Sequence, residues 1–255
     1  MKLFRLTLRT LLVRKVWVVA LLCVGVLPFV LPVLVPTEFA SGLVEPARAQ
    51  AAWVLLWLVT LFWMFGQGAK QGDSNARSGV GLYFQSLGYG RFRQMGEIWL
   101  AHVCFLFPLT LLAVFVCLGG AMPSQGHEAE AWIYINLQYA ALFLVATLPL
   151  LMLTIAFGSR FGALVGFLSS LGLSLYGLYG IGYLEVASQS ETNSLVRVLY
   201  SVSPHYHLAD LTDRLVFKMG HLDWGHFASI VTYLSGILFI LFAGSGFTFR
   251  PTVRA

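Results

Sequence analysis

The chain has 255 residues, of which 58% are hydrophobic and only 11% are charged, and its mean hydropathy is +0.79. This composition excludes an ordinary water-soluble domain, in which about a quarter of the residues are charged. It indicates an integral membrane protein. The formal net charge of +5 gives no support for nucleic-acid binding, because the basic residues flank apolar segments.

Six apolar segments follow one another along the chain, separated by polar or glycine-rich residues. A membrane span needs roughly 20 mainly apolar residues to cross a hydrocarbon core of about 30 Å. In lipid, backbone polar groups must be bonded within the protein, so we predict helices and an all-α integral membrane protein with one transmembrane domain, residues 1–255. The predicted spans are 16–35, 49–66, 98–118, 131–156, 162–184 and 226–247.

Residues 1–15 precede the first span and place basic and apolar side chains on different sides of a helix. Lys2, Arg5 and Arg9 share one side at helical spacing, and leucine and phenylalanine side chains cover the rest. This pattern predicts an amphipathic helix at the membrane interface, with its basic side toward lipid headgroups or a partner.

The basic residues gather on one side of the predicted spans. If both termini are cytoplasmic, twelve of the sixteen Lys and Arg residues lie on the cytoplasmic side, and nine of the eleven acidic residues lie outside. Lysine and arginine near span ends accumulate in the cytoplasm. We therefore predict six spans with both termini cytoplasmic.

Residues 67–96 form the longest predicted cytoplasmic loop and contain seven glycines. The loop runs into the segment SLGYGRFRQMGE, residues 86–97, in which two arginines and a glutamate stand directly before the third span. It is longer than a simple turn requires.

Three polar side chains, His102, Asn136 and Gln138, fall inside predicted spans. Polar groups within a membrane are candidates for a substrate path, and an interhelical hydrogen bond is the equal alternative. No carboxylate lies near the middle of a span, which disfavours a proton-driven or sodium-driven carrier.

Small residues recur at the start of the fifth span. Gly158, Gly162 and Gly166 are four residues apart, a spacing that permits close helix packing. The packing partner is either another span of the same chain or a second subunit.

Residues 185–225 form a long predicted external loop. Ser203-Pro204 is typical of a helix start, and apolar side chains follow it at helical spacing. The predicted apolar stripe consists of Leu208, Leu211, Leu215 and Met219. We expect an amphipathic helix on the outer leaflet, with Asp210 and Arg214 paired across one turn.

The sequence offers weak candidates for a metal site and no match to a nucleotide-binding loop. His205 and His207 are candidate metal ligands, and His207 would share a helical face with Asp210, but no H-E-x-x-H spacing is present and we predict no metal site. No segment matches the phosphate-binding G-x-x-x-x-G-K-[ST] loop. The chain is therefore not expected to be an enzyme, and we assign it no catalytic residue or cofactor.

Taken in order, these elements resemble the membrane subunit of a type-2 ABC exporter. The resemblance covers essentially the whole chain. It is carried by the basic start, six spans with both ends inside, the segment SLGYGRFRQMGE, and the order Ser203-Pro204, Leu222-Asp223-Trp224 and Phe249-Arg250 around the last span. It implies a permease of the bacterial cytoplasmic (inner) membrane that moves an unknown substrate by alternating access.

In that family a short coupling helix between spans two and three binds a separate ATPase subunit, which holds ATP and Mg. The resemblance places this element at residues 87–96 and a second permease copy, identical or not, beside the first. The implied contacts are Tyr89, Arg91, Phe92, Arg93, Gln94 and Glu97. Arg91 and Arg93 would pair with carboxylates of the ATPase, Phe92 would fill a groove in it, and Glu97 would hold the helix at the membrane edge.

Two other classes remain open. A self-contained secondary transporter or channel would place His102, Asn136 and Gln138 along one pore and would work without a partner. A metal-dependent intramembrane enzyme would bind stoichiometric metal at the external histidines.

Overall fold

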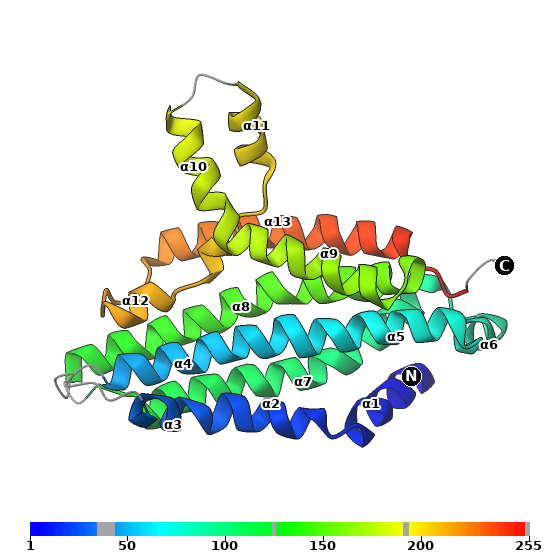
Figure 1. Ribbon diagram of the computed structural model, residues 1–255, viewed down its shortest axis with the longest axis horizontal. Coiled ribbons are helices and arrows are strands. Elements are labelled where there is room, and N and C mark those ends of the chain that lie inside the picture. The colour runs from blue at the N-terminus through cyan, green and yellow to red at the C-terminus, as the bar shows by residue number, and fades with distance from the viewer. Residues whose placement is uncertain (35–43, 124–125, 191–193, 253–255) are drawn as a thin grey trace.

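The protein folds as a bundle of long helices. The computed structural model describes residues 1–34, 44–123, 126–190 and 194–252, and all regular structure in these ranges is helical, which confirms the predicted all-α class. Among the described residues, five of the six predicted spans correspond to helical stretches long and apolar enough to cross a membrane, and their main parts run along the long axis in Figure 1. They are Val44–Arg77, Arg91–Gly120, Gly126–Phe161, Ala163–Ser188 and Trp224–Thr248. The chain is a multi-pass membrane protein by helix length and hydropathy.

Helix α1 (Lys2–Val13) lies at one end of the bundle, at an angle to the long helices (Figure 1). Leu3, Thr7 and Leu11 are buried on the side that meets α7 (Arg91–Gly120), and the basic residues of α1 are exposed. Lys15, with a φ of 54°, turns the chain into the next helix. The apolar side of α1 is therefore covered in part by protein.

The first predicted span, 16–35, is not one continuous helix. It forms α2 (Val16–Gly25) and α3 (Leu27–Leu34), with the break at Val26. Pro28 explains the break, because proline has no N–H to donate to the preceding turn and its ring clashes there. In the first turn of α3 the same proline is tolerated. Residue 35 and the rest of the following segment, to 43, lie outside the described residues.

The second and third spans extend well beyond their predicted bounds. Helix α4 (Val44–Leu58), a π-helical segment (Val59–Met64) and α5 (Phe65–Arg77) are continuous, so the predicted loop 67–96 begins inside a helix. The same loop contains α6 (Val80–Ser86), and α7 begins at Arg91 rather than near 98.

Glycines explain why the polar α5 segment is helical. An added Cβ at Gly72 would lie 2.1 Å from the carbonyl oxygen of Ile155, and one at Gly68 would lie 3.0 Å from the Leu151 side chain. These glycines therefore allow α5 to pack with its backbone close to α8 (Gly126–Phe161). The gain from this tertiary contact outweighs the low helix propensity of glycine.

Helix α8 is the central element of the bundle. It contacts α5, α7, α9 (Ala163–Leu175) and α13 (Trp224–Thr248). Aromatic side chains fill the space between α4 and α8, where Trp53 stacks on Tyr139 with ring centroids 4.0 Å apart. Helix α13 packs on α8 at the edge of the bundle and exposes Phe239 and Ile240 by 72% and 73%.

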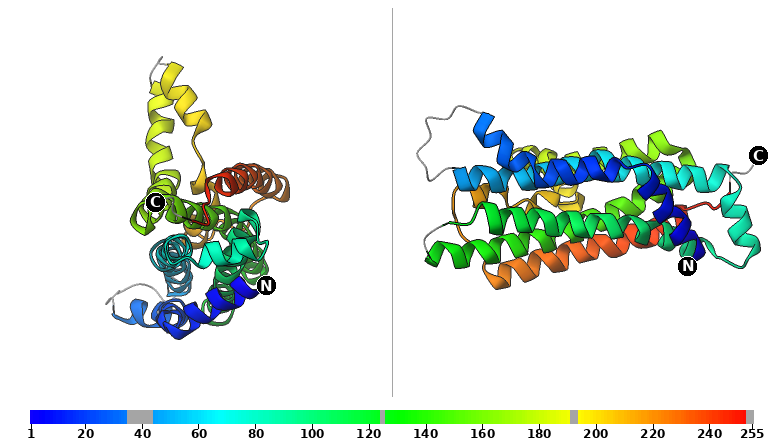
Figure 2. Two further views of the ribbon diagram at one scale, coloured as in Figure 1. Left: turned by 90° about the vertical axis from the view of Figure 1, so that its right-hand side faces the viewer. Right: turned by 90° about the horizontal axis from the view of Figure 1, so that it is seen from below.

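The fifth span bends and leaves the bundle. A π-helical segment, Tyr176–Gly180, joins α9 to α10 (Ile181–Ser190), a kind of insertion that commonly bends helices. Together α10 and α11 (Ser194–Val202) project from the bundle in Figure 1 and in the left view of Figure 2. Tyr183, Val186 and Val198 are strongly exposed on this projection.

The continuous amphipathic helix predicted after Ser203-Pro204 does not form. The chain makes a 3₁₀ turn (Tyr206–Ala209), then an extended residue, Asp210, and then the short α12 (Thr212–Val216). Asp210 interrupts the helix because its carboxylate accepts hydrogen bonds from the Thr212 N–H at 3.0 Å and from the hydroxyl groups of Thr212 and Tyr139, each at 2.5 Å.

Apolar side chains of the segment after Ser203-Pro204 pack on the bundle. Leu211 and Leu215 are buried, and α12 contacts α4, whereas Met219 is 60% exposed. The predicted pair of Asp210 with Arg214 is also wrong. The Arg214 guanidinium donates instead to the backbone carbonyl groups of residues 220 and 221, at 3.3 and 3.4 Å.

Candidate functional site

The segment assigned to a partner lies at the end of the bundle that carries α1 and α6 (Figure 1). Gly79 and Gly88, with φ values of 77° and 81°, turn the chain into and out of α6, a conformation that glycine adopts readily. Leu82 and Tyr83 of α6 are 59% and 60% exposed, and Leu87 is 47% exposed. Clustered exposed apolar side chains are typical of a protein-binding or membrane-binding surface.

Basic and aromatic side chains extend this surface onto the start of α7. The Arg91 guanidinium lies 5.2 Å from the ring centroid of Phe92 and 5.3 Å from that of Phe247, and the Arg93 guanidinium lies 3.8 Å from that of Tyr89. Such cation–π contacts hold both arginines while leaving them exposed. We call the residues Leu82, Tyr83, Leu87, Arg91 and Arg93 the end surface.

The structure places Phe92 differently from the predicted role. Its ring lies against Gly246 of α13, where an added Cβ would come within 1.9 Å of a ring carbon. Phe92 therefore packs partly in its own bundle, although 44% of it remains exposed.

Gln94 is buried and is not a surface contact, contrary to its predicted role. Its side-chain oxygen accepts a hydrogen bond from Asn75 Nδ2 at 3.2 Å, and its Nε2 donates to the carbonyl groups of Gly81 at 3.1 Å and Tyr89 at 3.0 Å. These bonds connect α5, α6 and the start of α7. Gln94 therefore positions the end surface rather than contacting a partner.

Glu97 is also buried, and it joins α1 to α7. One carboxylate oxygen accepts a hydrogen bond from the backbone N–H of Phe4 at 3.1 Å, and the other accepts one from Arg93 Nε at 3.3 Å. Phe4 is in the first turn of α1, where backbone N–H groups have no partner within the helix and the helix dipole favours a negative charge. Glu97 thus anchors the start of α1.

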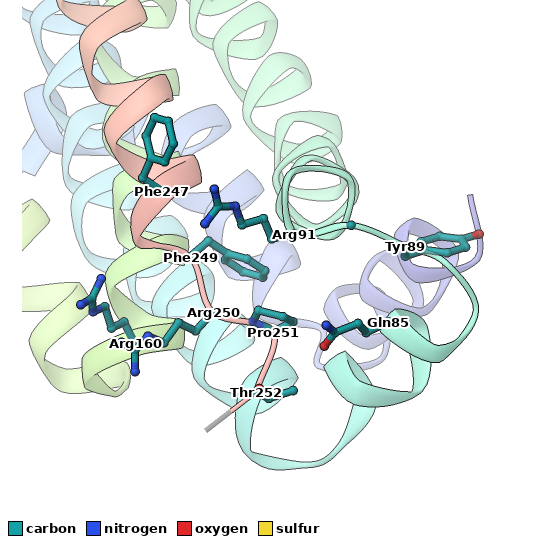
Figure 3. Close-up of a pocket in the computed structure, with 10 residues that line it drawn as sticks. Gln85, Tyr89, Arg91, Arg160, Phe247, Phe249, Arg250, Pro251 and Thr252 are labelled. Atoms are coloured by element: carbon teal, nitrogen blue, oxygen red, sulfur yellow. The ribbon is translucent and has the colours of Figure 1, made fainter. Parts of the chain in front are cut away.

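A cavity of about 480 Å³ opens beside the end surface, and Figure 3 shows the residues that line it. Three arginines from distant parts of the chain line it: Arg91, Arg160 and Arg250. Phe247, Phe249 and Pro251 form an apolar wall, and Gln85, Tyr89, Gly90 and Thr252 complete the lining. Sequence reasoning missed this cavity, because its residues are spread from 85 to 252 and no local pattern connects them.

Asn136 and Gln138, two of the polar residues inside the spans, form hydrogen bonds within the bundle. Asn136 accepts one from Trp53 Nε1 at 3.0 Å and donates one to the Trp132 carbonyl at 2.8 Å. Gln138 bonds both backbone groups of Leu222, donating to its carbonyl at 2.9 Å and accepting from its N–H at 2.8 Å. Both side chains are buried, so the interhelical alternative describes them better than a substrate path does.

His102 is fully buried on α7. Its Nδ1 lies 2.9 Å from the Ile98 carbonyl oxygen, one turn earlier. Its Nε2 has no hydrogen-bond partner within the described ranges.

The three spaced glycines do not lie on one helix. Gly158 is near the end of α8, Gly162, with a φ of 95°, forms the turn, and Gly166 is on α9. An added Cβ at Gly158 would lie 2.3 Å from the Ala69 carbonyl oxygen, and one at Gly166 would lie 2.5 Å from the Gly158 nitrogen. The close packing is therefore within one chain, among α5, α8 and α9.

The two candidate metal ligands His205 and His207 are neighbours, with ring centroids 5.6 Å apart. Burial, together with the nearby His205, lowers the pKa of His207, and the Glu185 carboxylate opposes this effect. His207 and Asp210 do not share a helical face, because the 3₁₀ turn ends before Asp210. No group of three His, Cys, Asp or Glu side chains in the described segments is placed to hold a metal ion.

Comparisons with protein-family models, with curated proteins and with solved structures find no match to this chain. Helix length and hydropathy identify a helical, multi-pass membrane protein.

Proposed function

We propose that the chain is the permease subunit of an ATP-binding-cassette transporter, working as an exporter with a second permease copy and a cytoplasmic ATPase. The observation that supports this proposal best is the end surface, where α6 and the start of α7 expose Leu82, Tyr83 and Leu87 next to Arg91 and Arg93. Apolar side chains supply contact area, and arginines can form bidentate pairs with carboxylates of a partner.

The link between this surface and the bundle supports a coupling role. Gln94 bonds α5 and α6 to α7, and Gly72 allows α5 to lie directly against the central α8. A displacement of α6 by an ATPase would therefore be passed to helices that cross the membrane. ATP binding in the partner can shift the permease between two states only through contacts that differ between those states, and the end surface would provide them.

A self-contained carrier or channel is the second candidate, and His102 is the observation that favours it. Among the described residues the Nε2 of His102 is buried without a hydrogen-bond partner, and buried polar groups normally have one. Transport by the chain alone in proteoliposomes, abolished by His102→Leu, would support the carrier and contradict the permease proposal.

The permease proposal is tested by affinity purification from native membranes in mild detergent. We expect a stoichiometric ATPase that contains a phosphate-binding loop to accompany the wild-type chain. Leu82→Glu, and separately Arg91→Glu with Arg93→Glu, should remove it without preventing membrane insertion.

Val198→Glu is the matched control, because Val198 is 61% exposed on α11 and Leu82 is 59% exposed on α6. The control should keep the ATPase. A wild-type chain that purifies alone and transports its substrate, or an ATPase retained by both end-surface variants, would refute the proposal.

A further inference from the structure

The cavity beside the end surface gathers positive charge without a balancing negative group. Arg91, Arg160 and Arg250 line it, and no carboxylate is among the lining residues. In the described ranges none of these arginines is in an ion pair, whereas Arg77 and Arg93 each pair with an acidic side chain. Like charges brought together repel one another, so a bound anion would stabilise this arrangement.

The backbone adds to this preference for an anion. The 30-residue helix α7 begins at the cavity, where Gly90 is the N-cap and supplies no side chain to bond the first N–H groups. An added Cβ at Gly90 would meet no atom within 4 Å, so the backbone there is accessible. The start of a long helix with free N–H groups favours phosphate, carboxylate and similar anions.

The position of the cavity favours a lipid as the source of the anion. Helix α13 has 25 residues and is therefore about 38 Å long, which exceeds a hydrocarbon core of about 30 Å by a few ångströms at each end. Phe247, at its end, lines the cavity and is still 66% exposed. The cavity thus lies near the depth of phospholipid headgroups.

An acyl chain would have a surface to follow from this position. Phe239, Ile240 and Phe242 are exposed along α13 on the way from the cavity toward the middle of the bundle. Figure 3 shows Phe247 and Phe249 on either side of Arg91, with Arg160 and Arg250 on the same side of the group as Phe249. The site therefore combines cationic groups for a headgroup with an apolar helix face for its chains.

We propose that this cavity binds the phosphate-containing headgroup of an anionic phospholipid, with Arg91, Arg160 and Arg250 as the phosphate-binding side chains. Basic cavities between helix ends at a membrane surface commonly bind such headgroups. The inference does not depend on the proposed transport function. Arg160 and Arg250 lie outside the end surface, so the two proposals can be tested by different substitutions.

The test uses the full-length protein in detergent and native mass spectrometry with phosphatidylglycerol and phosphatidylcholine of equal chain length. We expect phosphatidylglycerol to bind more tightly, and Arg160→Gln with Arg250→Gln to weaken it by about 25-fold, roughly 5-fold for each arginine. Arg77→Gln is the control, because Arg77 is an exposed arginine at the same end, is paired with Asp73 and does not line the cavity. Unfolding midpoints close to that of the wild type would show that the variants are folded.

Glycerol phosphate is added as a competitor to distinguish a lipid from a free phosphate. Failure of millimolar glycerol phosphate to displace phosphatidylglycerol supports a lipid site, and efficient displacement would overturn it in favour of a soluble phosphate. Equal affinity for the two lipids, or no difference between the double variant and Arg77→Gln, would also overturn the proposal. If Arg160→Gln with Arg250→Gln kept its lipid but lost a co-purifying ATPase, the proposal would also be overturned, because the arginines would then bind a protein partner.

Discussion

The packing of α5 against α8 can be tested at Gly72 by a single added methyl group. In Gly72→Ala the new Cβ would lie 2.1 Å from the carbonyl oxygen of Ile155, which is 1.3 Å closer than the 3.4 Å at which ordinary contact begins. The contacting atom is backbone on the central helix, so it cannot rotate away as a side chain could. The two helices must therefore separate by about 1 Å or bend.

Overpacking of this kind typically costs about 1–3 kcal/mol of folding free energy. Gly66→Ala is the matched control, since Gly66 is also on α5 and an added Cβ there meets no atom within 4 Å. Replacing glycine by alanine in a helix is otherwise favourable by up to about 1 kcal/mol. We expect Gly72→Ala to lower the thermal unfolding midpoint in detergent and Gly66→Ala to keep or raise it.

The assay is thermal unfolding of the purified variants, followed by tryptophan fluorescence or by loss of the monodisperse size-exclusion peak. A Gly72→Ala protein as stable as Gly66→Ala would refute the reasoning, because it would show that the α5 backbone does not approach α8 this closely. The same result would weaken the proposed route from α6 into the bundle.

Three further outcomes follow from buried polar contacts. Glu97→Ala should release the start of α1, because the Phe4 N–H loses its acceptor. Faster hydrogen exchange confined to residues 2–13 would show this release, and unchanged exchange there would contradict the anchoring role. Gln138→Leu should destabilise the fold by about 2–5 kcal/mol, because both backbone groups of Leu222 remain buried without a partner. If chemical denaturation showed that Gln138→Leu loses less unfolding free energy than Asn136→Leu, this expectation would be contradicted. Folding lowers the pKa of His207 from 6.5, so its contribution to the stability of the fold is complete above pH 6.5 and is lost as the pH falls below that value. His207→Gln should therefore flatten the pH dependence of the unfolding midpoint. An unchanged slope would argue against this assignment.

The sequence predicted the helical class and the approximate position of the five described helices that are long and apolar enough to cross a membrane, because apolar runs of this length leave few other ways to satisfy the backbone in lipid. It misplaced several boundaries. The sequence predicts a glycine-rich loop at residues 67–77, yet they are helical, because Gly68 and Gly72 allow the backbone of α5 to pack closely against α8. The apolar pattern of residues 16–35 predicts one span, yet the helix there breaks before Pro28.

Only the tertiary structure decided which polar residues are functional candidates. Gln94 directly follows the exposed Arg91 and Arg93 in the sequence, but its hydrogen bonds to Asn75 and Gly81 make it a positioning residue. Asp210 fits a helical face by spacing, but Tyr139 and Thr212 bond its carboxylate and end the helix there. Asn75, Gly81 and Tyr139 are more than ten residues away from the side chains that they bond, so local periodicity does not reveal these contacts.

The cavity lined by Arg91, Arg160 and Arg250 best separates what the sequence determines from what tertiary packing determines. The sequence determined that Arg91, Arg160 and Arg250 stand at the ends of apolar segments, because charge is excluded from the hydrocarbon. Their meeting around one cavity was decided by the packing of α7, α8 and α13, whose ends come together only when the bundle is assembled.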